Sequence, residues 1–423
     1  MNQVKSITLP NGVTVLYEHI EHIRSVLLGC WVKLGSREES KDLYGMAHFL
    51  EHMLFKGSSR RNAREIAESL EVVGGELNGF TSRENCCYYG KVTNDNLPLV
   101  CDVLSDLIFN PKLDREEIEL EKNVICQEID MVEDSLEEVA HETLVGIMVD
   151  ESLGHPVIGT KQHVKSFTYK EVKKFHTHFY HPKNIFLTMV GNLNEYDFES
   201  IALRDFGQIN STANPMKHVV NISCSKPQKK LVQKSVEQMH LVMGWEAFSV
   251  QHELRYVLHL ISAHLGGGMS SILFQKLREE LGLVYNVYSF IRAYRDIGIF
   301  GVYAGHTSNE LKIVHETILE VIENLKNKGI EESRLTQLKS QLKGNLLLGL
   351  EKTSFRMNRM GVGHLYFDRI LSPDELIKMV QAVTQSDIRR VANQLFAKEC
   401  ALVAVGDITE SEFIKFTQTG SQS

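Results

Sequence analysis

The sequence lacks the features that mark membrane, secreted and general nucleic-acid-binding chains. No apolar run approaches the roughly 20 residues needed to cross a bilayer. The first twenty residues show no basic region followed by an apolar stretch, so we do not expect them to be a secretory signal. The seven cysteines are scattered without a CxxC pair, which predicts free thiols and a cytoplasmic location. The net charge of −8 argues against nucleic acid as a partner.

Length and composition predict a globular protein of more than one domain. The chain has 423 residues, 43% of them hydrophobic and 24% charged, which is ordinary for proteins with sizeable cores. A single core rarely grows beyond about 300 residues. We therefore expect at least two domains.

The pattern of elements runs through the chain twice. A polar stretch with two prolines interrupts it, and we place a linker at 211–230 between a half at 1–210 and a half at 231–423. In the first half, periodicity and turn residues predict a hairpin at 7–20, strands at 25–35 and 185–193, and helices at 44–57, 62–73, 95–109, 114–148 and 168–180. In the second half they predict strands at 240–248, 283–291 and 298–305, helices at 253–265, 266–282, 308–328 and 331–352, and a closing helix and strand at 384–408.

The two halves share local sequence, which indicates an internal repeat. The segment 384–408 echoes 168–193, since in both a Thr opens a helix and an apolar strand runs to a glycine. The segment SILFQK at 271–276 aligns with HMLFKG at 52–57, and this alignment sets Gly267, Ser270 and Ser271 against His48, Glu51 and His52. These three ionisable residues therefore have no ionisable counterparts in the second half, and we expect the chemistry in the first half.

The segment GMAHFLEHMLFKG carries a pattern typical of a zinc site. On a helix the apolar side chains form one stripe, and His48, Glu51 and His52 lie together on the opposite side. Two histidines at i and i+4 can bind one ion, and a Glu beside the second can act as a base instead of binding metal. The alternative is a solvated polar helix face that happens to hold these residues.

A catalytic zinc site needs a third protein ligand, and the segment 114–148 offers one. Glu121 and Glu128 fall at the edge of the apolar stripe of this helix, whereas most of its other acids point away. A carboxylate that faces a core needs a compensating partner, and a metal or a metal-bound His can supply it. Pairing with a nearby Lys or Arg would serve as well, and the helix geometry alone leaves both interpretations open.

With these residues in view, the segment 45–84 resembles the signature of the pitrilysin-type, or inverzincin, zinc metallopeptidases, and the single-chain length resembles their bacterial processing-peptidase-like branch. Glu128 follows His52 by 76 residues, within the gap typical of that family. The resemblance implies that His48, His52 and Glu128 hold one Zn²⁺ per chain, that Glu51 is the general base, and that Glu121 is an accessory carboxylate.

The resemblance also implies how a peptide substrate is bound. Asn78, Gly79 and Phe80 match the family's substrate-binding edge strand, although Gly79 replaces a usual Ala and Cys86 a common Thr. In the second half, Arg278 and Tyr285 match a pair that contacts substrate. Without the resemblance they show only an Arg near a helix end and a Tyr that opens a strand.

For the whole chain, the resemblance implies an α+β fold of two homologous halves, each a mostly antiparallel sheet packed with helices. It implies a zinc endopeptidase that cleaves unfolded peptides or leader sequences inside a closed chamber, most simply as a homodimer. The competing hypotheses are a non-catalytic scaffold or regulatory subunit of the same family and a metal-binding protein without hydrolysis. A rival metal site at His176, His178 and His181 is disfavoured, because the repeat has no histidines there.

Overall fold

The computed structural model describes residues 4–193, 195–209, 222, 224, 227–367 and 369–419. The chain divides into two compact units, of which the first contains residues 1–130, 155–220 and 348–372 and the second contains residues 131–154, 221–347 and 373–423. Each unit therefore includes a segment from the other half of the sequence. The predicted linker at 211–230 divides the chain into two continuous halves and does not describe this exchange. Residues 211–221 of that stretch lie outside the described part of the chain.

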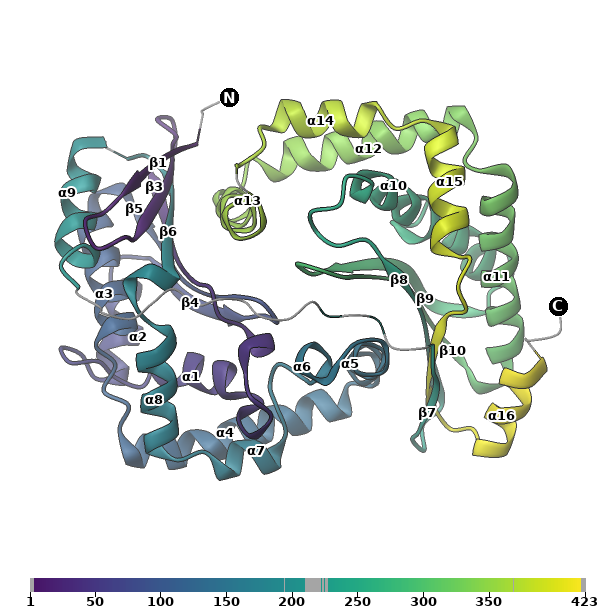
Figure 1. Ribbon diagram of the computed structural model, residues 1–423, viewed down its shortest axis with the longest axis horizontal. Coiled ribbons are helices and arrows are strands. Elements are labelled where there is room, and N and C mark those ends of the chain that lie inside the picture. The colour runs from purple at the N-terminus through teal and green to yellow at the C-terminus, as the bar shows by residue number, and fades with distance from the viewer. Residues whose placement is uncertain are drawn as a thin grey trace. The chain divides into compact units, whose positions relative to one another are not determined.

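The first unit is built on a six-stranded sheet (Figure 1). Its strand order is β1-β2-β6-β3-β5-β4, and only β2 and β6 run parallel. The central strands read as continuous apolar runs because helices cover both faces, and seven of the eight residues of β3 are buried. The strands are β1 (Lys5–Thr8), β2 (Thr14–His19), β3 (Ser25–Val32), β4 (Glu76–Thr81), β5 (Cys86–Thr93) and β6 (Ile185–Gly191).

Helices cover both faces of this sheet. One face forms a large core with helices from the first half of the sequence. The other is covered by α13 (Thr353–Tyr366), whose Met357 and Met360 pack with Trp31 and Phe186. The remaining helices of the unit are α1 (Met46–Leu54), α2 (Ala63–Glu71), α3 (Leu97–Phe109), the start of α4 (Arg115–Asp134), α7 (Lys161–Ser166), α8 (Tyr169–Phe179) and α9 (Glu195–Phe206).

The second unit repeats this design with five strands. Their order is β7-β11-β8-β10-β9, and again one pair, β7 and β11, runs parallel while the others are antiparallel. Starting from β2, the first sheet shows the same order and the same strand directions. The strands are β7 (Lys229–Gln233), β8 (Gln238–Ala247), β9 (Val284–Ala293), β10 (Gly298–Thr307) and β11 (Ala401–Gly406). The expected α+β fold of two related halves is confirmed.

Helices of both halves of the sequence surround the second sheet (Figure 1). One face packs on helices from the second half of the sequence, and α5 (Leu136–Met148) covers the other face through Leu144, Val145 and Met148. The other helices are α6 (Glu151–Gly154), α10 (Arg255–Gly266), α11 (Leu311–Lys328), α12 (Glu332–Gly349), α14 (Pro373–Gln381), α15 (Gln385–Leu395) and α16 (Glu410–Thr419).

Most predicted elements are present, and local chemistry explains their ends. The helices α8 and α15, which the repeat relates, both begin with a capping box, Thr168 with Glu171 and Thr384 with Asp387. The helix predicted at 114–148 is two helices, because the chain leaves helical geometry at Ser135. All seven cysteines are free, as expected. None of the described helices is both long and apolar enough to span a membrane.

The glycine-led helix expected at 266–282 is shorter. Gly268 has a φ of +144°, which is incompatible with a right-handed helix. Helical structure begins after it, and residues Phe274–Glu280 form π-helical turns.

Candidate metal centre

The helix α1 presents the predicted ligands on one side and packs on the core with the other. Met46, Phe49, Leu50, Met53 and Leu54 are fully buried. His48, Glu51 and His52 lie on the opposite side and are partly exposed. The amphipathic arrangement predicted from the sequence is confirmed.

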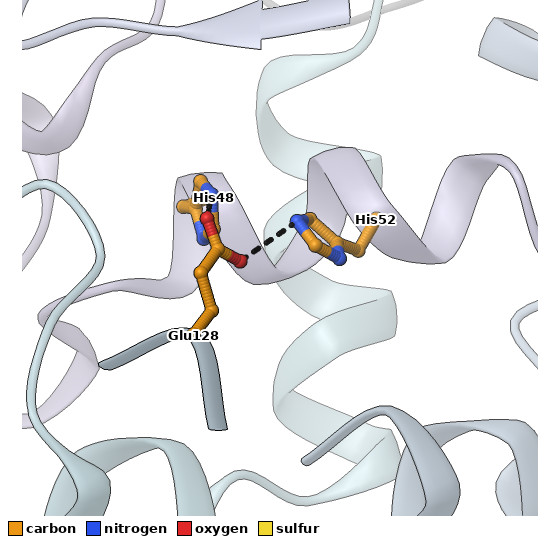
Figure 2. A group of neighbouring side chains, drawn as sticks. All are labelled: His48, His52 and Glu128. Atoms are coloured by element: carbon orange, nitrogen blue, oxygen red, sulfur yellow. Dashed lines mark ion pairs between the residues drawn. The ribbon is translucent and has the colours of Figure 1, made fainter. Parts of the chain in front are cut away.

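The helix α4 brings Glu128 to the two histidines (Figure 2). The Nε2 atom of His48 lies 3.7 Å from Oε1 of Glu128, and Nε2 of His52 lies 3.5 Å from Oε2. One ligand atom from each of the three side chains falls within 4.8 Å of the others. In the described part of the chain, no second group of three His, Cys, Asp or Glu side chains meets this criterion.

The donor set fits zinc. Two imidazole nitrogens and a carboxylate are ligands that zinc prefers, and a tetrahedral ion with bonds of about 2.0–2.2 Å needs its ligand atoms roughly 3.3–3.6 Å apart. The separations from Glu128 to His48 and His52 lie near that range. Burial, and then the neighbouring charge of His52, lower the pKa of His48 to about 4. His48 is therefore neutral at pH 7, the state that binds a metal.

Glu121 orients His52 from the side away from Glu128. Its Oε1 lies 2.8 Å from Nδ1 of His52, and its Oε2 accepts a hydrogen bond of 2.6 Å from the ammonium of Lys56. Burial alone raises the pKa of Glu121, but the hydrogen bonds from His52 and Lys56 outweigh burial and hold that pKa below its ordinary value. With Nδ1 bonded to this carboxylate, Nε2 of His52 is left to bind an ion.

Glu51 stands beside the cluster without being a member of it. Its Oε2 accepts a 2.5 Å hydrogen bond from the hydroxyl of Thr81, at the end of β4. Burial raises the pKa of Glu51, and the hydrogen bond from Thr81 opposes that rise. Sequence reasoning missed Thr81 and Lys56, because neither shows a pattern until the folded chain brings it to Glu51 or Glu121.

The predicted substrate strand lies at the edge of the first sheet. Asn78, Gly79 and Phe80 belong to β4, which pairs only with β5 among the described strands. A Cβ at Gly79 would lie 3.2 Å from a ring carbon of Tyr88 and 3.3 Å from one of Phe55. The glycine therefore fits a tighter space than an alanine would.

Arg278 and Tyr285 lie together in the second unit. Arg278 is in the π-helical turns, and its Nη1 donates a 2.7 Å hydrogen bond to the carbonyl of Tyr285, the second residue of β9. The Tyr285 side chain is exposed.

In the rival HTHFYH segment, Nε2 of the buried His176 lies 2.8 Å from the Ile108 carbonyl oxygen, a structural contact.

Comparison with known proteins agrees with the metal cluster. The family model described as "Insulinase (Peptidase family M16)" matches residues 14–161, and one described as "Peptidase M16 inactive domain" matches residues 166–342. The part that holds all three candidate ligands thus matches the first of these. The chain belongs to peptidase family M16, the pitrilysin-type family.

Relatives along the whole chain carry matching names. An "Uncharacterized zinc protease" of Bacillus subtilis is 36% identical over 408 residues, covering 95% of this chain and 98% of the relative. One of Streptomyces coelicolor is 31% identical over 416 residues, covering 97% and 91%.

Solved structures share the fold. A protease from Helicobacter pylori superposes with a TM-score of 0.91 at 22% identity, covering 96% of this chain and all of the other. A "peptidase M16 inactive domain" from Pseudomonas fluorescens gives 0.89 at 17% identity, covering 96% and 99%.

Proposed function

We propose that this chain is a zinc-dependent endopeptidase with one ion per chain, held by His48, His52 and Glu128. The observation that supports this most directly is the convergence of these three ligands beside Glu51. Bound zinc would lower the pKa of a water molecule and polarise the scissile carbonyl. The relatives named as zinc proteases support the same choice of metal.

Glu51 is the base in this mechanism. Thr81 donates to its Oε2, which leaves Oε1 as the acceptor for a proton from the attacking water. Glu51 then delivers that proton to the leaving amine. Burial, which raises the pKa of Glu51, brings that pKa closer to the pH at which the enzyme would work.

The edge strand β4 would bind the substrate by adding it as a further strand. Such pairing reads the peptide backbone and accepts many sequences. It also requires an extended chain, so the substrates would be unfolded peptides or leader sequences. Arg278 and Tyr285 would hold the substrate carbonyl or stabilise the oxyanion.

A quenched-peptide assay combined with metal analysis tests this function. Glu51→Gln should retain zinc and lose activity by about 10²- to 10⁴-fold, because the base is removed and the ligands are kept. Glu128→Gln should lose both zinc and activity. Glu133→Gln, on the exposed side of the same helix, is the control and should keep both. A wild-type protein without zinc, or a fully active Glu51→Gln, would contradict the proposal.

The family resemblance further supports a homodimer in which the metal-binding half of one chain works with the second half of its partner inside a closed chamber. Complementation tests this arrangement. Mixing Glu51→Gln chains with chains carrying Arg278→Ala and Tyr285→Phe should restore roughly a quarter of wild-type activity, because half of the dimers are mixed and each has one intact site. No recovery after exchange of the chains would refute sites shared between partners.

The non-catalytic alternative has less support. A scaffold or regulatory subunit has no need of a base beside the ligands, and this chain keeps both histidines and Glu128 in one cluster with Glu51 beside it.

A further inference from the structure

The helix that carries the metal ligands begins on a buried carboxylate from outside the helix. The side chain of Glu39 is fully buried. Its Oε2 accepts a 2.7 Å hydrogen bond from the Gly45 N–H, and its Oε1 accepts a 2.6 Å hydrogen bond from the Ala47 N–H. The first N–H groups of a helix have no partners within it, and a negative charge is favoured there. Since α1 has no acidic residue in its first turn, Glu39 takes that role.

His155 holds the carboxylate in place. Its Nε2 lies 3.0 Å from Oε2 of Glu39, and its side chain is only 4% exposed. The ring of Tyr44 stacks on the imidazole with centroids 3.6 Å apart and planes 10° from parallel. Glu39 therefore joins the N–H groups of the N-cap residue Gly45 and of Ala47 in α1 to a residue more than a hundred positions later in the chain.

Two glycines fix the backbone around this contact. Gly45 has a φ of +95°, and a Cβ there would lie 2.7 Å from the carbonyl oxygen of Ile158. Gly159 has a φ of +74°, and a Cβ there would lie 2.4 Å from the carbonyl oxygen of Tyr44. Both positions combine a left-handed backbone with direct backbone contact, so only glycine fits. The start of α1 is thus pressed against segment 155–159.

We propose that Glu39 and His155 are positioning residues: they fix the position of α1 and thereby the orientation of His48 and His52 toward Glu128. Neither residue belongs to the ligand cluster. Ala47, whose N–H donates a hydrogen bond to Glu39, immediately precedes His48, so a shift at this contact moves the first ligand directly. The inference deepens the proposed function and rests on it for the identity of the ion.

Amide hydrogen exchange in the zinc-free chain tests the contact without any activity assay. In Glu39→Gln an NH2 group that cannot accept a hydrogen bond replaces one of the two oxygens that bond to the Gly45 and Ala47 amides, and we expect amide exchange there to accelerate at least about tenfold. His155→Leu should show the same change to a smaller degree. His155→Gln, whose amide can still donate to Glu39, should restore wild-type exchange.

Zinc titration against a chromogenic chelator tests the consequence for the metal. Glu39→Gln and His155→Leu should bind zinc about tenfold more weakly, at the lower end of the effect seen for groups that orient metal ligands. In the zinc-saturated enzymes kcat should fall while KM stays within about twofold. His176→Leu is the matched control, because it removes another buried histidine of the same unit that contacts a carbonyl. It should lower stability and leave zinc affinity unchanged.

Wild-type zinc affinity and wild-type amide exchange in Glu39→Gln would overturn the inference. If Glu39→Gln does not fold, the comparison of His155→Leu with His155→Gln tests the inference instead. Equal zinc affinity in these two variants would overturn the inference as well. Failure of the proposed function looks different, since the wild-type protein itself would then lack zinc or hydrolysis while the accelerated exchange in Glu39→Gln remained.

Discussion

Replacing Glu121 by Gln should weaken zinc binding through His52, although Glu121 is not a ligand. The side chain of Glu121 is 3% exposed, and its carboxylate bonds to Nδ1 of His52 and to Lys56. A hydrogen bond to a charged group contributes about 1.5–3 kcal/mol, which corresponds to roughly 10- to 150-fold in a binding constant. Measured losses at residues that orient metal ligands are about 10- to 100-fold. We therefore expect a loss in zinc affinity of about 10- to 100-fold.

Competition with a chromogenic zinc chelator measures this affinity, and the zinc-dependent rise in melting temperature provides a second readout. The matched control is Glu119→Gln, since Glu119 lies on the same helix, has an exposed side chain and pairs with a lysine, Lys122, as Glu121 does with Lys56. It should bind zinc like the wild type. If Glu121→Gln also bound zinc within twofold of the wild type, the reasoning that Glu121 orients His52 would be refuted.

Three further predictions concern the base, the packing of α13 and acid stability. Thr81→Val should move the acidic limb of the kcat–pH profile to higher pH, because the lost hydrogen bond had lowered the pKa of Glu51; an unmoved limb would contradict this. Gly361→Ala should destabilise the chain by about 1–3 kcal/mol in urea unfolding, because its Cβ would lie 2.3 Å from the buried Trp31 ring. Gly344→Ala, in open space, should not destabilise it. The zinc-free chain should lose stability as pH falls from 6.5 to 4. Burial lowers the pKa of four histidines to about 4, so the unfolded chain binds more protons than the folded chain over this range; they are His141, His264, His315 and His364. Urea midpoints that stay constant between these pH values would contradict the role of these histidines.

The sequence predicted the ligand helix well because the signal is local. Apolar spacing alone identified the buried side of α1, and Glu121 and Glu128 were correctly placed at the edge of the buried stripe of α4. Helix geometry could not separate the two carboxylates. In the structure Glu121 is 3% exposed with two polar partners, whereas the side chain of Glu128 is 39% exposed beside both histidines.

The contacts that position the site could not be predicted, because they join distant segments. Nothing in the sequence around Glu39 shows that it caps α1, and nothing around His155 shows that it bonds to Glu39. The helix α13 was also missed, since its two glycines weaken the helical signal. Gly361 is required there by tertiary packing, because Trp31 occupies the space of a side chain.

The exchange of α5 and α13 between the sequence halves has a consequence for dissection of the chain. A fragment ending near residue 210 would keep α5 without the sheet that covers Leu144 and Val145, and would leave Trp31 without Met357. The complementary fragment would expose the face of the second sheet that α5 covers and the face of α13 that packs on Trp31. Two such fragments, made separately, should aggregate when alone and recover a native-like state when refolded together, so the gene cannot be cut at its most polar stretch without creating two mutually dependent pieces.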